Sequence, residues 1–569
     1  MGTVTRVNGP LVEVAGLTGV AMSGIVTLGE RALPGEVVTL RGESATIQAY
    51  EYTGGLAPGT AVRSVGSPLS APLGPGLLGG VFDGLLRPLA GVGPWLDPAA
   101  MRGAADGHRY AFTPVAREGD RLAAGAPIGT VRLDGAVAYQ VLVPPGADGE
   151  VREVRPAGAY PGDAVVARVG DRELTLTTGW PVRRPRPYRE RLAVAAPLRT
   201  GQRVIDLLFP VPRGGTVAVP GGFGTGKTML LQQIAKWCDA DVIIYVGCGE
   251  RGNEMADVLA ELAELTDPRT GGRLAQRTVV IANTSNMPMM AREASIYSAV
   301  TVAEHFRDMG LDAVVIADST SRWAEALREF ASRSGELPAE EGYPAALASA
   351  LAAFYERAGR VTTLGGGTGS VTIIGAVSPP GGDLTEPVTT HTQRFVRALW
   401  TLDRDLAYAR HYPAVSWAGS FARDADAVGR WQANAGGDSR WAARRGRVAA
   451  LLAEADRLAA LAELVGAGAL PDDERVVLLA GRLIREAVLQ QSAISPRDAS
   501  CDPPRAAAIA DAVLDVVDRC QELVAGGTSA AAIEELDFTP VIRAREDAAT
   551  PADVRARRDA TLSRLRETP

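Results

Sequence analysis

The sequence predicts a multidomain protein in which β-rich modules come first, an α/β domain with a phosphate-binding loop (P-loop) follows, and a helical domain comes last. Three observations predict this class. The chain has 569 residues, too many for one hydrophobic core. Apolar strand-like runs alternate with helical stretches over 186–424, and the period becomes helical throughout over 425–569. A glycine-rich segment in the middle matches G-x-x-x-x-G-K-T.

The residues before the α/β domain fall into three segments. Over 1–68, short apolar alternations separated by glycine-rich turns predict a small β-barrel. Over 69–109, frequent proline and glycine predict a connector with a short helix near Asp83 to Leu89. Over 110–185, period-two stretches with repeated glycine turns predict a separate β-rich module, which holds no obvious catalytic motif.

The glycine-rich segment predicts a nucleoside triphosphate site. A strand-like run precedes it and a helix-like run follows it, so its backbone N–H groups and a helix N-terminus can face phosphate oxygens. A chance glycine-rich turn, the alternative, would not need this order. Lysine occurs only at 227 and 236, which sets Lys227 apart, and the Thr228 hydroxyl is placed to hold Mg²⁺. The predicted nucleotide-binding residues of the loop are Gly221, Gly222, Phe223, Gly224, Thr225, Gly226, Lys227 and Thr228.

A second Mg²⁺ ligand is predicted at the end of another strand. The run Val314-Val315-Ile316-Ala317-Asp318 is apolar and ends in an acid, which is the Walker-B form. We therefore expect Asp318 at the carboxyl edge of the sheet, beside Thr228 and the metal. The alternative is an Asp that caps the following helix, and the two roles are compatible.

A candidate catalytic carboxylate follows the strand-like run at 242–246. Glycines lie on both sides of the pair Glu250-Arg251, so the backbone can approach the phosphates closely. We expect Glu250 to orient the attacking water, and Arg251 to neutralise charge or to fix that carboxylate. The alternative is a surface Glu-Arg ion pair, which contributes little to stability.

Composition excludes several classes of partner. The net charge is −7 and the pI is about 5.5, so no global basic face is present and we expect no nucleic-acid partner. The four cysteines have neither metal-ligand spacing nor the density of a disulfide scaffold, which is typical of reduced cytosolic thiols. We see no signal segment and no apolar run of about 18 residues, so we expect any membrane role to go through partner subunits.

Longer motifs carry a family resemblance. These motifs are GERGNEM at 249–255, ADSTSRWAEALRE at 317–329, PAEEGYP at 338–344, SPPGGD at 378–383, RVNGPLV at 6–12, LGPGLLG at 73–79 and WPVRRPRP at 180–187. With them, the chain resembles, across nearly its whole length, the catalytic A subunit of V-type and archaeal-type (V/A) ATPases. The β-rich module at 110–185 is similar to the bulge domain that separates A subunits from the related F-type catalytic chain.

The resemblance implies an ATP-hydrolysing or ATP-synthesising subunit of a rotary, ion-translocating complex. It implies an A3B3 hexamer with ATP or ADP and Mg²⁺ at the A/B interfaces, and an arginine finger supplied by the B subunit. Central and peripheral stalk subunits would connect the hexamer to a membrane sector that moves H⁺ or Na⁺, which places this chain at the cytoplasmic face of the cell membrane. In that family Glu250 would be the catalytic glutamate, with Lys227, Thr228 and Asp318 on the phosphates and Mg²⁺.

Recognition of the adenine base is less regular in this chain. Tyr412 matches an aromatic position expected to stack on the base, and a core tyrosine is the alternative. Members of the family usually carry an aromatic residue near Ile494, so we expect weaker base affinity here. Thr225 stands where eukaryotic members often have a cysteine, which removes thiol-based switching at the loop. Arg322 is a lesser candidate for a contact near the phosphates, with a structural ion pair as its alternative.

Two other classes of function are weighed against this one. A regulatory nucleotide-binding subunit without chemistry, like the companion B subunit, is disfavoured by the intact P-loop and by Glu250. A hexameric nucleic-acid translocase of the Rho type is disfavoured by the acidic balance and by the lack of a basic, aromatic N-terminal face.

Overall fold

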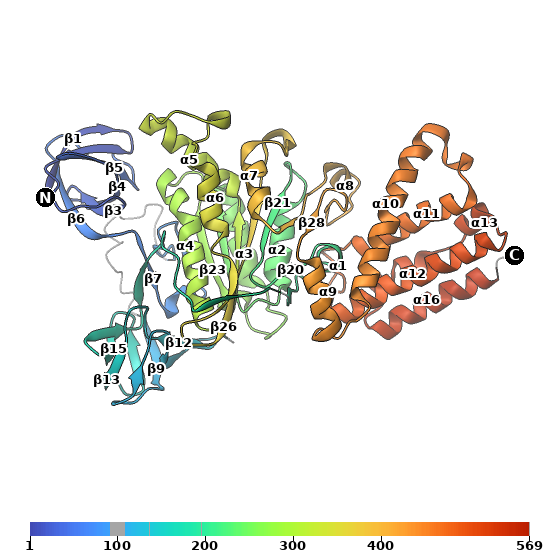
Figure 1. Cartoon of the computed structure of the whole chain (residues 1–569), viewed down its shortest axis with the longest axis horizontal. Helices are drawn as coiled ribbons and strands as arrows, with labels where there is room; N and C mark the ends of the chain where they lie inside the picture. Colours follow the sequence, from blue (N-terminus) through green and yellow to red (C-terminus); the bar gives the residue numbers. More distant parts are fainter. Residues whose placement is uncertain (91–107, 136, 195, 568–569) are drawn as a thin grey trace.

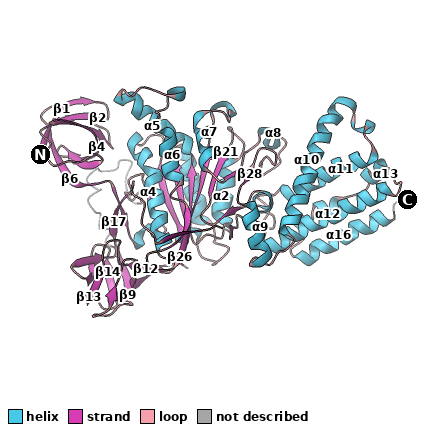
Figure 2. Cartoon of the chain, in the orientation of Figure 1, coloured by secondary structure: helices cyan, strands magenta, loops and turns pink. Residues whose placement is uncertain are grey.

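The computed structural model describes residues 1–90, 108–135, 137–194 and 196–567. The chain forms an elongated molecule whose two ends lie far apart (Figure 1). An N-terminal barrel and a second β-rich module lie side by side at one end, a sheet covered by helices occupies the middle, and a helical bundle forms the other end (Figure 2). The predicted fold class is confirmed.

The first module is a closed barrel with the strand order β1-β2-β5-β4-β3-β6. Its core consists of alternate apolar side chains, among them Val12, Val26, Leu28 and Val37, which are fully buried. Its strands are β1 (Gly2–Asn8), β2 (Leu11–Ala15), β3 (Gly24–Leu28), β4 (Leu33–Arg41), β5 (Ser44–Ala49) and β6 (Ala61–Pro68).

The segment after the barrel belongs to two sheets. β7 (Ser70–Leu73) pairs antiparallel with β17 (Thr178–Pro181), and a 3-10 turn (Pro75–Leu77) leads to β8 (Val81–Phe82), which joins the edge of the central sheet. The helix predicted near Asp83 to Leu89 is wrong.

A tight turn replaces that helix, because the Asp83 carboxylate accepts the backbone N–H groups of Leu85 and Arg87, at 3.1 and 2.7 Å. Leu86 has φ +61°, which a right-handed helix does not permit.

The second β-rich module consists of two four-stranded sheets, in the orders β10-β13-β15-β16 and β12-β11-β9-β14. All pairings are antiparallel, as expected from the period-two sequence. The strands are β9 (Arg109–Pro114), β10 (Arg121–Leu122), β11 (Pro127–Arg132), β12 (Tyr139–Leu142), β13 (Gly149–Val154), β14 (Gly158–Pro161), β15 (Val165–Val169) and β16 (Arg172–Thr175).

The middle of the molecule is a ten-stranded sheet with the order β28-β27-β21-β26-β24-β22-β23-β8, in which β25 pairs with β26 and β18 with β25. The strands from β27 to β8 in this order are parallel, so their carboxyl ends share one edge. The strands are β18 (Glu190–Leu192), β21 (Thr216–Pro220), β22 (Val242–Cys248), β23 (Thr278–Asn283), β24 (Asp312–Asp318), β25 (Gly359–Thr362), β26 (Thr368–Val377), β27 (Ala398–Leu399) and β28 (Phe421–Ala422), with β19 (Pro197–Leu198) and β20 (Val211–Pro212) pairing separately.

Helices cover this sheet, and its strands are therefore buried and apolar almost throughout. α4, which runs along β22, β24 and β26, is the most deeply buried of them. The helices of this part are α1 (Arg203–Leu208), α2 (Lys227–Trp237), α3 (Gly252–Glu264), α4 (Met289–Asp308), α5 (Thr320–Ser334), α6 (Leu347–Tyr355), α7 (Pro387–Phe395) and α8 (Arg404–Tyr408), with 3-10 turns at Leu274–Arg277, Glu340–Gly342 and Pro380–Gly382.

The C-terminal part is helical, as predicted. Val448, Leu452, Ala455 and Leu458 form a buried apolar stripe on α10, which packs against α11 and α12. Among the described residues, no helix is both long enough and apolar enough to cross a bilayer. The helices are α9 (Ala425–Asn434), α10 (Trp441–Val465), α11 (Asp472–Leu483), a π-helical turn (Ile484–Leu489), α12 (Pro503–Ala525), α13 (Ala530–Glu534), α14 (Thr539–Ile542), α15 (Ala544–Asp547) and α16 (Pro551–Arg566), with a 3-10 turn at Ala467–Ala469.

Candidate functional site

The P-loop connects the end of β21 to the start of α2. Gly224 and Gly226 have φ values of +78° and +85°, which glycine adopts without strain, so the chain can turn tightly before α2 begins at Lys227. A Cβ atom on Gly222 would lie 3.6 Å from the Cα of Gly382, so this loop and the turn after β26 approach each other closely. The predicted order of strand, loop and helix is confirmed.

Lys227 points back into the loop. Its Nζ donates to the carbonyl oxygens of Gly221 and Gly222, the second at 3.0 Å. Burial lowers the pKa of this amine, and the nearby Asp318 and Glu250 carboxylates act in the opposite direction. The two carbonyl oxygens therefore hold the ammonium against the loop.

Thr228 and Asp318 meet, as the sequence predicts. The Thr228 hydroxyl donates to Oδ2 of Asp318 at 3.1 Å, and the Tyr245 hydroxyl donates to the same oxygen at 3.2 Å. Burial raises the pKa of the Asp318 carboxyl, which these two hydrogen bonds oppose. Asp318 is 4% exposed at the end of β24, whereas Thr228 lies exposed at the start of α2.

These oxygens suit a hard divalent cation. Mg²⁺ is held by one or two protein oxygens together with substrate phosphates, and not by an all-protein cage. The described part of the chain holds no cluster of three or more His, Cys, Asp or Glu side chains that could bind a metal.

Glu250 follows β22 on the same edge of the sheet. Gly249 has φ +76°, and a Cβ atom there would lie 2.9 Å from Cβ of Arg322 and 3.1 Å from Cδ of Arg292, so only glycine fits. Burial, then the Asp318 and Glu254 carboxylates, raise the pKa of Glu250 to about 8, and the charge of Arg322 lowers it. A carboxyl group with a pKa in this range can accept a proton near neutral pH.

The two candidate arginines occupy different places. Arg251 is exposed just before α3, and within the described residues no hydrogen bond or ion pair joins it to Glu250. Arg322, from the first turn of α5, is the cation whose charge acts on Glu250, and it also pairs with Glu325 at 3.2 Å. The expectation that Arg251 fixes the Glu250 carboxylate is therefore not met in this conformation.

Sequence reasoning missed three neighbours of these groups, which are Tyr245, Glu254 and Arg292. Tyr245 lies on β22, just before the motif GERGNEM at 249–255, and Glu254 lies within that motif at the start of α3. Their positions beside the motif could have indicated them. Arg292 comes from α4 and carried no local signal.

Three exposed side chains form a rim at the P-loop. We define this rim as Phe223 of the loop itself together with Tyr412 and Ile494, which are 98%, 42% and 93% exposed. The Tyr412 ring lies over the loop, because a Cβ atom on Gly226 would lie 3.3 Å from its Cε1. The backbone N–H of Gln491 donates to the Tyr412 carbonyl at 2.8 Å, which brings the segment with Ile494 beside this tyrosine. The alternative of a core tyrosine is wrong.

The cysteines are inert by position. All four are free and buried. Cys248, at the end of β22, donates to the carbonyl oxygen of Arg292 at 3.6 Å, and burial raises its pKa to about 12. A thiol with this pKa stays protonated and packs as a small apolar side chain.

Family models match four stretches of the chain. They are the beta-barrel domain of the ATP synthase alpha/beta family at 4–66, the alpha/beta subunit barrel-sandwich domain at 104–183, the nucleotide-binding domain of the same family at 201–422, and the C-terminal domain of V and A type ATP synthase at 434–526.

Relatives that match most of the chain point to the same family as these models. The V-type ATP synthase alpha chain of Anaeromyxobacter dehalogenans is 52% identical over 510 residues, which cover 89% of this chain and 88% of that one. The corresponding A-type ATP synthase protein of Methanopyrus kandleri is 47% identical over 549 residues, covering 94% and 92%. The type III secretion ATPase EscN of enteropathogenic E. coli shares the fold, with a TM-score of 0.66 and 21% identity over 91% of this chain and 100% of that one. The chain belongs to the family of V-type and A-type ATP synthase alpha (A) chains.

Proposed function

We propose that this chain is the catalytic subunit of a rotary V/A-type ATP synthase or ATPase, and that it makes or cleaves ATP at its P-loop. The observation that carries the proposal is the meeting of three strand ends. The Thr228–Asp318 contact and the half-buried Glu250 carboxyl group lie at one edge of the central sheet, beside Lys227. Burial and neighbouring carboxylates raise the pKa of Glu250 to about 8, which supports a role in proton transfer beyond nucleotide binding.

Each loop has a separate task in this proposal. The amides of 221–228 and the Lys227 ammonium bind the phosphates, and Lys227 exchanges its carbonyl partners for phosphate oxygens when nucleotide enters. Glu250 orients the attacking water and accepts its proton while the bond to the leaving ADP oxygen breaks. In synthesis the same groups act in reverse order.

Mg²⁺ would be held by Thr228 and Asp318, whose oxygens are 3.1 Å apart. Bound there, the ion neutralises charge on the β- and γ-phosphates. Arg322 holds positive charge near Glu250 in the described conformation. We propose that Arg251, which is exposed, neutralises charge once a neighbouring subunit covers the site.

The exposed rim supports a site completed by another subunit. The partly exposed ring of Tyr412 can stack on the base, and the side chains of Phe223 and Ile494 are almost fully exposed to solvent. We propose an A3B3 hexamer in which the B subunit closes this side and supplies an arginine finger, with central and peripheral stalks leading to a membrane sector that moves H⁺ or Na⁺. The chain would then lie at the cytoplasmic face of the membrane without crossing it.

We further propose that the chain divides into a barrel (1–68), a connector (69–109), a bulge module (110–185), a nucleotide-binding domain (186–424) and a helical domain (425–569). Residues 91–107 of the connector lie outside the described residues.

The test is ATP formation by inverted membrane vesicles under an imposed proton gradient without sodium, with wild type and Glu250→Gln compared. We expect synthesis that depends on Glu250. If both proteins give the same nonzero rate, Glu250 has no catalytic role and the proposal is wrong. If neither makes ATP, ATP-driven uptake of H⁺ and of Na⁺ in the same vesicles must depend on Glu250 for the proposal to stand.

A further inference from the structure

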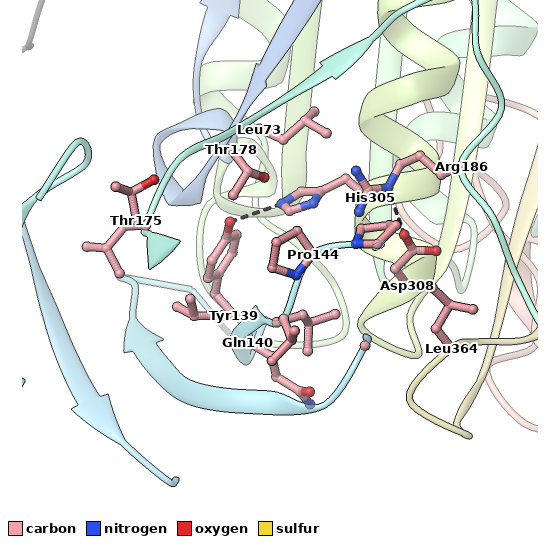
Figure 3. Close-up of a pocket in the computed structure, with 16 residues that line it drawn as sticks. Leu73, Tyr139, Gln140, Pro144, Thr175, Thr178, Arg186, His305, Asp308 and Leu364 are labelled. Atoms are coloured by element: carbon pink, nitrogen blue, oxygen red, sulfur yellow. Dashed lines mark hydrogen bonds and ion pairs between the residues drawn. The ribbon is translucent and has the colours of Figure 1, made fainter. Parts of the chain in front are cut away.

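The bulge module and the nucleotide-binding domain are joined by a linker, which we define as residues 182–186. This linker lies along α4 of the nucleotide-binding domain. The Val182 carbonyl accepts hydrogen bonds from Thr301 and Arg357, at 3.1 and 2.6 Å. Four residues later the Arg186 guanidinium donates to Asp308 at 2.7 Å, at the far end of α4. Figure 3 shows Arg186 and Asp308 beside the cavity where Tyr139 of the bulge module hydrogen-bonds His305 of α4.

Arg183 of this linker joins two carboxylates from different modules. Its guanidinium donates to both oxygens of Glu293 on α4, at 2.8 and 2.7 Å, and to Oε2 of Glu36 on barrel strand β4 at 3.4 Å. Glu36 and Glu293 are 4% and 5% exposed. The hydroxyl of Tyr50, which is fully buried, donates to the same Glu36 oxygen.

Glu293 adjoins both chain segments that surround Glu250. The preceding residue, Arg292, packs on Gly249 and donates to the Ser285 carbonyl at 3.2 Å, while the Ser285 N–H donates to the Glu250 carbonyl at 2.9 Å. The Glu293 carbonyl itself accepts from the indole N–H of Trp323 at 3.1 Å.

Trp323 directly follows Arg322, the cation that acts on Glu250, and is fully buried. A shift of Glu293 would therefore disturb the surroundings of Glu250 by two routes, through Arg292 and through Trp323.

We propose that Arg183 is a positioning residue for the catalytic loop, and that its paired hydrogen bonds to Glu293 tie the geometry around Glu250 to the N-terminal barrel. This inference rests on the proposed function of Glu250. The planar guanidinium can bind both Glu293 oxygens and still reach Glu36, whereas an ammonium is a point charge that cannot reproduce this fork. Arg183 touches no substrate in this role, because it acts through Glu293.

The test compares Arg183→Gln, Arg183→Lys and Glu293→Gln in the assembled complex, with Arg186→Gln as the matched control. Arg186 lies in the same linker, is 7% exposed, and pairs with the other end of the same helix. ATP hydrolysis is divided by the number of ATP-binding sites titrated in each preparation, so that loss of folded protein does not count. Thermal melting of each complex is recorded in parallel.

We expect Arg183→Gln and Glu293→Gln to lower kcat about tenfold to a hundredfold with little change in KM for ATP, because the P-loop lies on a different strand. Arg186→Gln should keep kcat per site and lose only thermal stability. Arg183→Lys should regain stability but not kcat. In single-turnover cleavage, adding Arg183→Gln to Glu250→Gln should cause no further loss, since both act on one step.

Three results would overturn the proposal. The first is equal kcat per site for Arg183→Gln and Arg186→Gln. The second is full recovery of kcat by Arg183→Lys. The third is a further loss of single-turnover cleavage when Arg183→Gln is added to Glu250→Gln. Failure of the proposed function is distinct, since Glu250→Gln alone would then turn over normally.

Discussion

The phosphate end of the site and its exposed rim are built differently. At the phosphate end, Thr225 and Asp318 are 2% and 4% exposed, and the side chains of Lys227 and Thr228 already have hydrogen-bond partners. On the rim, Phe223 and Ile494 are almost fully exposed. The difference teaches that the strand ends hold the side chains of the phosphate end in place within one chain, whereas the side chains of the rim are left open to solvent.

The largest effect should come from the phosphate end. Lys227→Ala removes the only charged side chain of the loop, and we expect ATP hydrolysis by the complex to fall about 10³-fold. The matched control is Lys236→Ala, since Lys236 lies at the end of the same helix over the ring of Trp237. Equal activities of the two variants would contradict the view that the phosphate end carries the chemistry.

The next largest effect should be on the concentration of Mg²⁺ that ATP hydrolysis requires. Binding of the ion needs the ionised Asp318 carboxylate, and the raised pKa of this group means that protons compete more strongly as the pH falls. In Mg²⁺ titrations of ATP hydrolysis repeated at successively lower pH, wild type should require more Mg²⁺ as the pH falls.

Asp318→Asn is the counterpart of that titration. It should lower activity about a hundredfold and remove this pH dependence of the Mg²⁺ requirement. A Mg²⁺ requirement that still changes with pH in Asp318→Asn would assign the titration to another group.

A smaller effect is expected on the rim. Tyr412→Ala removes the ring that lies over Gly226, and loss of one stacking contact should raise KM for ATP about tenfold while kcat changes little. Tyr412→Phe keeps the ring and should behave like wild type. If Tyr412→Ala lowers kcat and leaves KM unchanged, the tyrosine serves the phosphate end instead.

The smallest effect should come from Ile494, which is 93% exposed. Ile494→Phe offers the base a second aromatic face, and we expect KM for ATP to fall about threefold. Ile494→Val is the control, with KM unchanged. A KM that rises in Ile494→Phe would mean that the base does not approach this side of the rim.

Prediction from sequence worked where function lies in consecutive residues. Lys227 and Thr228, the acid at the end of β24, and the turn after β22 were placed correctly because each follows a buried strand, and parallel strands end at one edge. The helix predicted near Asp83 failed because one side chain redirected the backbone, which is a choice between local hydrogen bonds that periodicity does not report.

Long-range contacts could not be predicted. The charge of Arg322 acts on Glu250 from α5, whereas Arg251, the chain neighbour of Glu250, is exposed. Arg183 meets Glu36 across 147 positions and Glu293 across 110, and no spacing in the sequence encodes either pair.

The measurement that tests the account most directly is single-turnover cleavage of γ-labelled ATP by complexes with wild-type Glu250 and with Glu250→Gln, repeated across pH. Because the carboxylate is the active form and its pKa is raised to about 8, wild-type cleavage should rise with pH through about 8. Glu250→Gln should still bind ATP, but cleave it about a thousandfold more slowly and without this pH dependence. Cleavage by Glu250→Gln at the wild-type rate would contradict the account.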